Sequence, residues 1–168
     1  MEGGPDVIKM QQIGVDNTIA TLGTALTREH LSLLKRYHAK LCFLPDADAP
    51  GIEAVMKNGR LAMQEGFRVL VKEIPPTEDG KKQDADSYFT HKNQVEEVSN
   101  EDFVIWYARQ VYDENKTDTA KSDAVRDICN IVVTEQDEYT RATLVEALAE
   151  KYGHKTLWKN AVNEAKKR

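Results

Sequence analysis

The chain has 168 residues, enough for one domain or for one domain with a smaller appended unit. Its 28 Asp and Glu outweigh 23 Lys and Arg, and the net charge of −5 is the wrong sign for a segment that grips a phosphate backbone alone. No apolar run approaches the ~20 residues of a membrane span, and the 2 cysteines and 4 histidines lack the spacing of a zinc site. Cys42 and Cys129 lie in apolar contexts, so we expect buried, reduced thiols in a cytoplasmic protein without membrane contact.

Residues 1–95 alternate between short β-rich runs and amphipathic helical stretches. Apolar residues at helical spacing, bounded by Pro, Thr and Gly, predict helices over residues 5–14, 27–38 and 51–66. Short β-branched or continuous apolar runs predict strands over residues 17–22, 41–44 and 67–74. Strands separated by single helices are typical of a parallel sheet, so this part is predicted to be α/β.

The remainder of the chain changes in character. Residues 75–84, rich in Pro and charge, predict a solvated loop, and from residue 100 onward there is no convincing strand. Helical patterns with caps cover residues 100–115, 117–136, 137–153 and 154–168. We therefore expect a first domain over residues 1–95 and an all-helical subdomain over residues 96–168.

Two pairs of aspartates, each separated by one residue, follow predicted strands. Asp46 and Asp48 lie in the stretch CFLPDADAPG, at the end of an apolar run, and Asp84 and Asp86 follow the strand at residues 67–74 and its loop. Residues two apart in an extended segment point to the same side, so each pair of carboxylates repels unless a cation lies between them. Either pair alone is a weak signal, because solvated loops contain many such sequences.

The acidic positions together predict a metal site. The carboxyl ends of parallel strands lie on one edge of a sheet, so both aspartate pairs and Glu2, near the chain start, can converge there. Convergent carboxylates without His or Cys suit a hard cation, Mg²⁺ or Mn²⁺. Such ions serve phosphoryl and nucleotidyl transfer, where two of them clamp the attacking and leaving oxygens.

Several segments resemble the toprim region of bacterial DnaG-type primases. The first 36 residues after Met1, EGGPDVIKMQQIGVDNTIATLGTALTREHLSLLKRY, are similar to that family's Glu-Gly start, hydrophobic helix and Leu-Gly-Thr-Ala-Leu-Thr turn. CFLPDADAPGIEAV and DGKKQDADSYF resemble its two D-x-D segments, and residues 120–166 resemble the helical subdomain of its catalytic core. The resemblance implies a toprim-type, mainly parallel sheet flanked by helices, followed by a small all-helical subdomain.

The resemblance also implies roles for individual residues. Glu2 matches the family's acidic catalytic position and Asp6 its following aspartate. Thr24 falls on the turn beside the metal site, where its hydroxyl could reach phosphate, whereas capping of a helix is expected for Thr27. The metal positions of the family fall on Asp46, Asp48, Asp84 and Asp86.

Three departures from the family's pattern bear on this site. GGP replaces a larger pair of residues between Glu2 and Asp6, and LPDADAP has a proline before Asp46 and no glycine between the aspartates. The family's first strand precedes the glutamate, whereas here only Met1 does. We therefore expect a piece of a larger primase, with an incomplete sheet edge near Glu2 and little or no activity by itself.

The implied function is template-directed synthesis of RNA primers by a nucleotidyltransferase during DNA replication. Its cofactors would be two Mg²⁺ or Mn²⁺ ions, without zinc in this region. Its partners would be a single-stranded DNA template and NTPs, bound by the full-length protein, and a replicative helicase. Two alternatives stay open: a toprim nuclease or topoisomerase-like phosphodiester enzyme, and a non-catalytic interaction module of the replication machinery.

Overall fold

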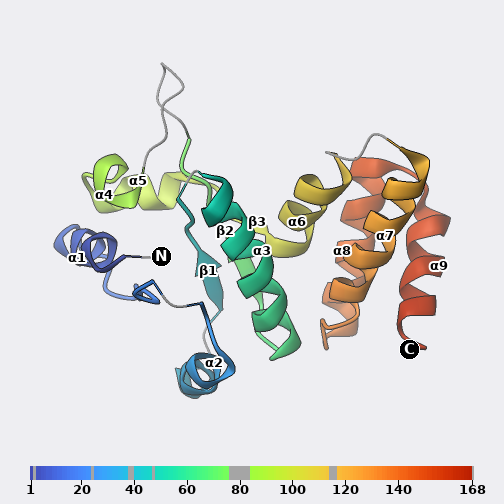
Figure 1. Cartoon of the computed structure of the whole chain (residues 1–168), viewed down its shortest axis with the longest axis horizontal. Helices are drawn as coiled ribbons and strands as arrows, with labels where there is room; N and C mark the ends of the chain where they lie inside the picture. The colour runs from blue at the N-terminus through green and yellow to red at the C-terminus, as the bar shows by residue number, and fades with distance from the viewer. Residues whose placement is uncertain are drawn as a thin grey trace.

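The computed structural model describes residues 1, 3–23, 25–37, 40–46, 48–75, 84–113 and 117–167. They form a small sheet with helices around it and, on the opposite side of the molecule, a group of packed helices (Figure 1). Glu2, Thr24 and residues 76–83, most of the predicted loop, lie outside the described residues. No helix in the described ranges is long and apolar enough to cross a membrane.

The sheet, as far as the structure describes it, has three short strands in the order β1 (Leu41–Phe43), β2 (Val69–Val71) and β3 (Glu101–Asp102). β1 and β2 are parallel, and β3 is antiparallel to β2. A parallel pair needs a long crossover, which α3 (Ala49–Gln64) supplies between the two strands. The predicted α/β fold is confirmed, with a mixed rather than a mainly parallel sheet.

α3 covers β1 and β2 with one apolar face. Val55 and Ala62 are buried on this face, because positions three and four apart share one side of a helix. Gly59 lies between them and leaves room for the ring of Phe103, whose nearest carbons would lie 2.2 to 2.6 Å from a Cβ at this position. The absence of a side chain at Gly59 therefore permits the close approach of α3 and α6 (Phe103–Tyr112).

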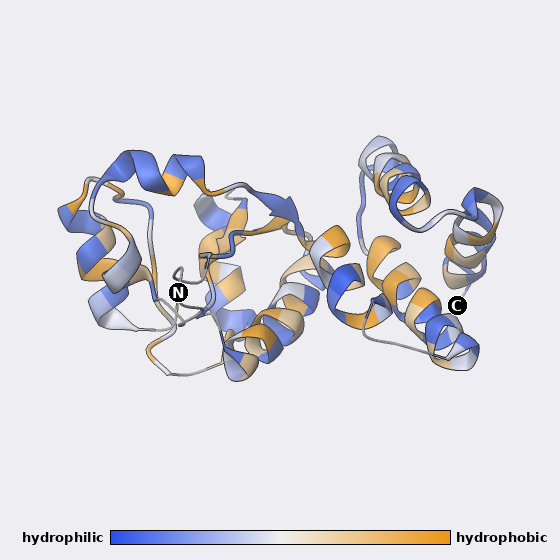
Figure 2. Ribbon diagram, turned by 90° about the horizontal axis from the view of Figure 1, so that it is seen from above, coloured by the Kyte–Doolittle hydropathy of each residue, from blue (hydrophilic) through white to orange (hydrophobic). Residues whose placement is uncertain are grey.

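The C-terminal helices pack on one another and on α6. α7 (Asp118–Val132), α8 (Glu138–Tyr152) and α9 (Lys155–Ala165) turn their apolar sides toward a shared interior, which Figure 2 shows as facing hydrophobic surfaces. Fully buried side chains fill this interior, among them Trp106, Ile128, Leu148 and Trp158. This core is continuous with that between α3 and the sheet. The predicted helical character of this part is confirmed, whereas the division at residues 95 and 96 stays a prediction.

A second, smaller core lies on the other side of the sheet. It joins α1 (Gly4–Gln12), α4 (Ala85–Tyr88) and α5 (Lys92–Glu97) to the residues that follow β1 and β2. Its buried members are Met10, Leu44, Ile74, Ala85, Phe89 and Val98. The sequence patterns do not predict α4 and α5, because helices this short show little apolar periodicity.

Three sequence-based expectations are wrong. Residues 17–22 form no strand, and Val15, Asn17, Thr18, Ile19 and Thr21 instead line a cavity of about 350 Å³ whose other wall includes β1. β3 lies within the region expected to lack strands, because the edge of β2 pairs with two acidic residues of low β-propensity. Cys42 is exposed, whereas Cys129 is buried as expected.

Candidate functional site

The first aspartate pair lies in a tight turn between β1 and α3. Asp48 is the N-cap of α3, and its Oδ1 accepts a hydrogen bond of 2.8 Å from the amide of Gly51. Amides in the first turn of a helix have no acceptor within the helix, and this bond provides one for Gly51, while Pro50 in the same turn has no N–H to satisfy. The amide of Asp48 donates to the carbonyl oxygen of Asp46 at 2.8 Å and closes the turn.

Gly51 fixes how closely this turn folds over the helix. A Cβ at Gly51 would lie 2.6 Å from the carbonyl oxygen of Asp46 and 3.2 Å from Oδ1 of Asp48. The first distance is too short for any side chain, and the contacted atom is backbone, which cannot move aside alone. A glycine is thus required for both aspartates to keep their places, and the Pro-Gly pair after the D-x-D motif is the sequence signal for it.

The second aspartate pair begins α4. Asp84 is the N-cap, and its Oδ1 accepts bonds from the Ser87 amide at 2.8 Å and from the Ser87 hydroxyl at 2.6 Å. These two bonds, the hydroxyl first, lower the pKa of Asp84. Asp86 is exposed in the first turn of the same helix. Asp-x-x-Ser is a capping pattern, and it explains locally why this aspartate lies at a helix start.

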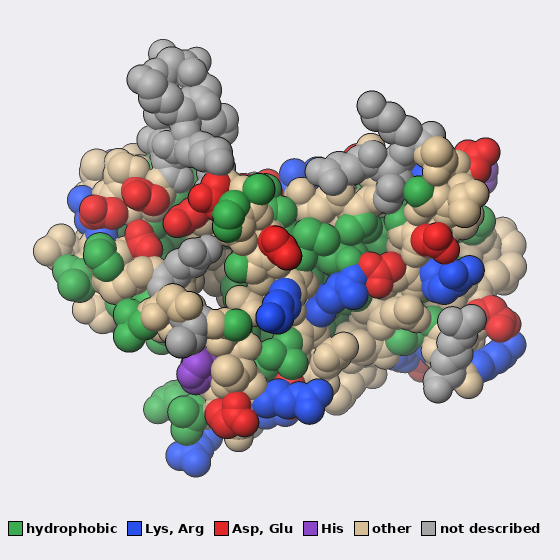
Figure 3. Space-filling view, in the orientation of Figure 1, with side chains coloured by type: hydrophobic (Ala, Val, Ile, Leu, Met, Phe, Trp, Pro, Cys, Tyr) green, Lys and Arg blue, Asp and Glu red, His purple; other side chains and the backbone are tan. Residues whose placement is uncertain are grey.

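The small core places three acidic segments around one interior. Leu44 precedes Asp46 by two residues, and Ala85 lies between Asp84 and Asp86. Met10, one helical turn beyond Asp6 on α1, packs in the same core. Acidic side chains gather on this side of the molecule, where Figure 1 places α1 and α4, whereas Lys and Arg lie mostly toward the centre and the other side (Figure 3).

The other predicted positions divide into those with local roles and those not described. Asp6 accepts a hydrogen bond of 3.2 Å from the amide of Gly3 and so closes the start of α1. The Oγ1 of Thr27 accepts a bond of 3.3 Å from the His30 amide, which confirms its predicted capping role for α2 (Arg28–Leu34). Glu2 and Thr24 lie outside the described residues.

The described carboxylates do not form a group of three or more potential metal ligands, and the His and Cys side chains add none. Mg²⁺, however, keeps several water ligands and is typically bound through one or two protein carboxylates together with substrate phosphates. Asp46 and Asp48 supply two carboxylates just beyond the carboxyl end of β1, in a turn that hydrogen bonds fix. Two such carboxylates are the protein ligands that a Mg²⁺ site of this kind needs. The donor set therefore fits Mg²⁺ or Mn²⁺ and offers nothing for zinc among the described residues.

A lysine adjoining the site has a structural partner that sequence patterns do not reveal. Lys72 follows β2 and lines the cavity beside β1. Its Nζ donates hydrogen bonds to the carbonyl oxygens of Val95, at 2.6 Å, and Val98. These carbonyls lie at the C-terminal end of α5, where backbone acceptors lack helical partners, so the cation ties α5 to the sheet.

Known proteins match both the part of the chain that contains the acidic turns and the helical part. The profile of the Toprim-like family matches residues 1–89. The DNA primase of Clostridium acetobutylicum is 32% identical over 160 residues, which cover 91% of this chain and 26% of that protein. A DNA primase of Staphylococcus aureus is 36% identical over 75 residues, 45% of this chain and 12% of that protein. The chain thus spans about a quarter or less of the length of these relatives.

Solved structures share the fold. A DNA primase domain from Pseudomonas aeruginosa superposes with a TM-score of 0.73 at 22% identity, covering 96% of this chain and 52% of that one. The DnaG primase catalytic domain bound to ssDNA gives a TM-score of 0.72 at 20% identity, covering 89% and 49%. The resemblance to the toprim and helical parts of bacterial primases is confirmed, and the chain belongs to the Toprim-like family.

Proposed function

We propose that this chain is the metal-binding and helical part of a primase, a nucleotidyltransferase that synthesises RNA primers on single-stranded DNA. The observation that carries the proposal is the turn at the end of β1, where Asp46 and Asp48 are held against the start of α3. The identity of 32% to a DNA primase covers 91% of the chain, so it includes the helical part as well as the acidic turn.

In this proposal Asp46 and Asp48 hold one divalent ion, and Asp84 and Asp86 form a second acidic pair for another. When bound, such ions supply charge stabilisation for the attacking 3′-hydroxyl and the departing pyrophosphate of an NTP. The chain's own contribution is positional, because the Asp48–Gly51 bond fixes the carboxylate before any ion arrives. Glu2 is the proposed base or an additional ligand.

The proposed partners follow from charge and from the relatives. A net charge of −5 suits a chain that holds cations and, through them, nucleotide phosphates. The DNA template and the NTPs are bound by a full-length primase in the cytoplasm, with a replicative helicase as a further partner. We expect little or no primer synthesis from the 168 residues alone.

Titration with Mn²⁺ tests the metal assignment on the chain itself. Paramagnetic broadening of amide signals should appear first around Asp46 and Asp48, and then around Asp84 and Asp86. Asp46→Asn should weaken the binding, whereas Asp16→Asn, at an exposed aspartate outside these turns, should leave it unchanged. Broadening confined to other acidic surfaces would remove the basis of the proposal.

The reaction is tested separately in a chimera. The matching 160-residue segment of the C. acetobutylicum primase is replaced by this chain, and primer synthesis is measured on single-stranded DNA with NTPs and Mg²⁺. A folded chimera should make primers, and its Asp46→Asn variant should not. A folded chimera that cleaves DNA and makes no primers would favour a phosphodiester nuclease instead.

A further inference from the structure

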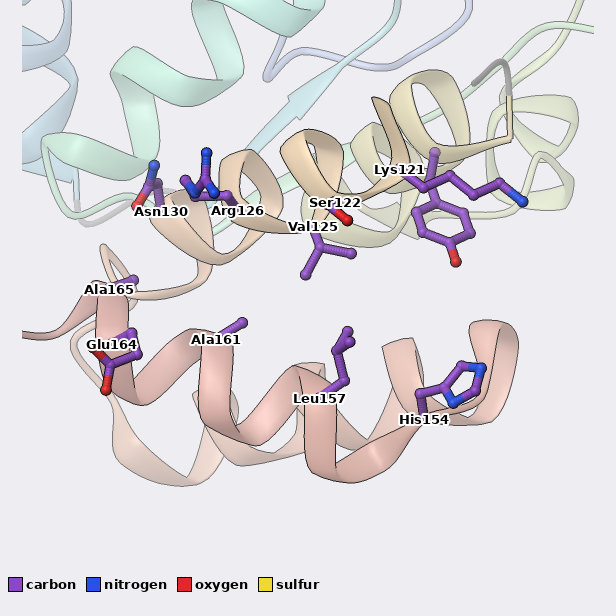
Figure 4. Close-up of a pocket in the computed structure, with 11 residues that line it drawn as sticks. Lys121, Ser122, Val125, Arg126, Asn130, His154, Leu157, Ala161, Glu164 and Ala165 are labelled. Atoms are coloured by element: carbon purple, nitrogen blue, oxygen red, sulfur yellow. The ribbon is translucent and has the colours of Figure 1, made fainter. Parts of the chain in front are cut away.

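A groove runs along the outer surface of the helical part, between α7 and α9. Its volume is about 300 Å³, and in Figure 4 Val125 on one helix faces Leu157 and Ala161 on the other, whereas Arg126, Asn130 and Glu164 lie at its edges with their side chains directed outward. The α7 wall carries Lys121, Ser122, Val125, Arg126 and Asn130, and the opposite wall carries His154, Leu157, Ala161, Glu164 and Ala165. The groove lies apart from the acidic turns, which are on the far side of α3 from this bundle.

The α9 wall of the groove is mainly apolar. Leu157, Ala161 and Ala165 follow one another at four-residue intervals, so they form a stripe along one face of α9. Leu157 is 49% exposed, although Trp158 beside it is buried. The small side chains at 161 and 165 leave the space that a larger apolar side chain of a partner can fill.

Two cationic side chains, Lys121 and Arg126, lie along the α7 side of the groove, and one acidic side chain, Glu164, lies on the α9 side. Lys121 lies with its Nζ 5.4 Å from the centre of the Tyr112 ring and forms no ion pair with the described residues. Arg126 is bridged to Asp123 at 3.1 Å, but both side chains are more than 60% exposed, so that pair is weak and readily exchanged. His154 starts α9 and makes no capping hydrogen bond through its side chain.

We propose that this groove binds an amphipathic helix of a partner protein, with leucine-sized side chains on one face and Asp or Glu beside them. Apolar partner residues would cover Leu157 and the alanine stripe, and the acidic residues would meet Lys121 and Arg126. From Lys121 to Asn130 the α7 wall is about 14 Å long at 1.5 Å per residue, which accommodates two to three turns of such a helix.

The chemistry of the groove favours an acidic helix over nucleic acid. A single-strand binding surface presents exposed aromatic rings on which bases stack, whereas Lys121 covers the Tyr112 ring here and the other apolar residues of the groove are aliphatic. A mixed apolar and basic groove is typical of helix recognition through spaced apolar anchors.

The test uses the full chain and a designed peptide. The peptide is a capped helix of about 14 residues with leucines three and four apart and glutamates beside them. Amide signals of α7 and α9 should shift on titration. Leu157→Glu should weaken binding about tenfold or more, because it removes a leucine contact and adds repulsion. Lys121→Glu should weaken it several-fold.

Matched controls distinguish binding in this groove from non-specific binding of the peptide. Leu33→Glu, at a leucine 54% exposed on α2, and Lys57→Glu on α3 should leave the affinity unchanged. The same peptide with lysine in place of glutamate should bind much more weakly. Equal binding of both peptides, or no binding of the acidic one, would overturn the proposal. Oligo-dT binding lost in Lys121→Glu, or a dimer dissolved by Leu157→Glu, would equally overturn it.

Discussion

Arg60 on α3 donates a hydrogen bond to the Asp127 carboxylate on α7 and thereby links the helix that covers the sheet to the helical bundle. The hydroxyl of Tyr107, on α6 between them, donates to the same carboxylate at 2.5 Å. The guanidinium of Arg60 also lies over the Tyr107 ring, 4.6 Å from its centre. Three elements therefore share one charged contact.

Removing this contact should loosen the connection between the two parts. Arg60→Met is expected to lower the free energy of unfolding by about 1–2 kcal/mol, because the hydrogen bonds are charge-assisted but the pair is partly exposed. Urea denaturation of Arg60→Met, Asp127→Asn and the double variant measures the coupling. Arg126→Met is the control, since its pair with Asp123 is exposed, and should cost less than about 0.5 kcal/mol. Full additivity at Arg60 and Asp127 would show that the link contributes nothing.

Gly59 should not accept even a methyl group. Gly59→Ala gains helix propensity of about 1 kcal/mol but forces a Cβ against the buried ring of Phe103, so we expect a net loss of about 1–3 kcal/mol in unfolding free energy. Adding Phe103→Leu should recover part of the loss, because the smaller side chain makes room. Glu53→Ala, at an exposed position of α3, should be nearly neutral. A stabilised Gly59→Ala would mean that the two helices do not approach as closely as described.

The fold was predictable from sequence wherever a local pattern predicts an element and the rest of the chain provides a surface or strand for that element to pack or pair against. The helices α3 and α7 combine periodic apolar residues with an Asp or Thr cap, and they form where expected. The helix α8 also forms where expected, although its apolar residues are spread around the helix, because Asp137 caps its start and Gly153 ends it. The segment 17–22 has β-branched residues, but a strand needs a paired neighbour, and β1 has a strand partner only at its β2 edge among the described residues. Ile19 accordingly remains 53% exposed.

The acidic turns were predictable in position but not in the roles that their side chains take. A D-x-D motif after a strand locates Asp48, yet the capping bond to Gly51 depends on the helix that follows. Asp84 likewise is held by Ser87, three residues on. The burial of Leu44 and Ala85 in one core is a tertiary fact with no local signature, because these residues are 41 positions apart. Sequence alone therefore locates the two acidic turns but not the core that they share, and convergence of their carboxylates stays a prediction.

Stability should fall in alkaline solution through Cys129. Burial raises the pKa of this thiol to about 12, whereas an unfolded chain ionises it near its ordinary value of 9.0. Above that value the unfolded state binds fewer protons than the folded one, so stability declines by up to ~1.4 kcal/mol per pH unit. The Tyr152 hydroxyl contributes little to this decline between pH 9.0 and 10.0, because its pKa in an unfolded chain is 10.0.

Urea denaturation at pH 8 and at pH 10 measures this decline. Cys129→Ala should reduce the slope, leaving the smaller part that comes from Cys42, whose pKa is also raised by partial desolvation. The variant should be less stable at both pH values. Alkylation by iodoacetamide provides an independent check on the same residues. Cys42 is exposed and should react in the folded chain, whereas Cys129 should react only after unfolding. An unchanged slope in Cys129→Ala would assign the alkaline loss to other groups.

Gly51→Ala should damage the proposed metal site without removing a carboxylate. The new Cβ would lie 2.6 Å from the carbonyl oxygen of Asp46, so the turn must open and the two aspartates must separate. We expect Mn²⁺ affinity to fall about tenfold, which is the size of loss expected when one ligand is no longer held in the right orientation. The effect on folding should be smaller, because the start of a helix can shift more easily than its interior.

Gly4→Ala is the matched control: its Cβ would meet only Leu22, at an ordinary 3.6 Å, and Mn²⁺ binding should be unchanged. Equal Mn²⁺ affinity in Gly51→Ala and the unaltered chain, with the fold intact by circular dichroism, would show that the ion does not depend on this turn.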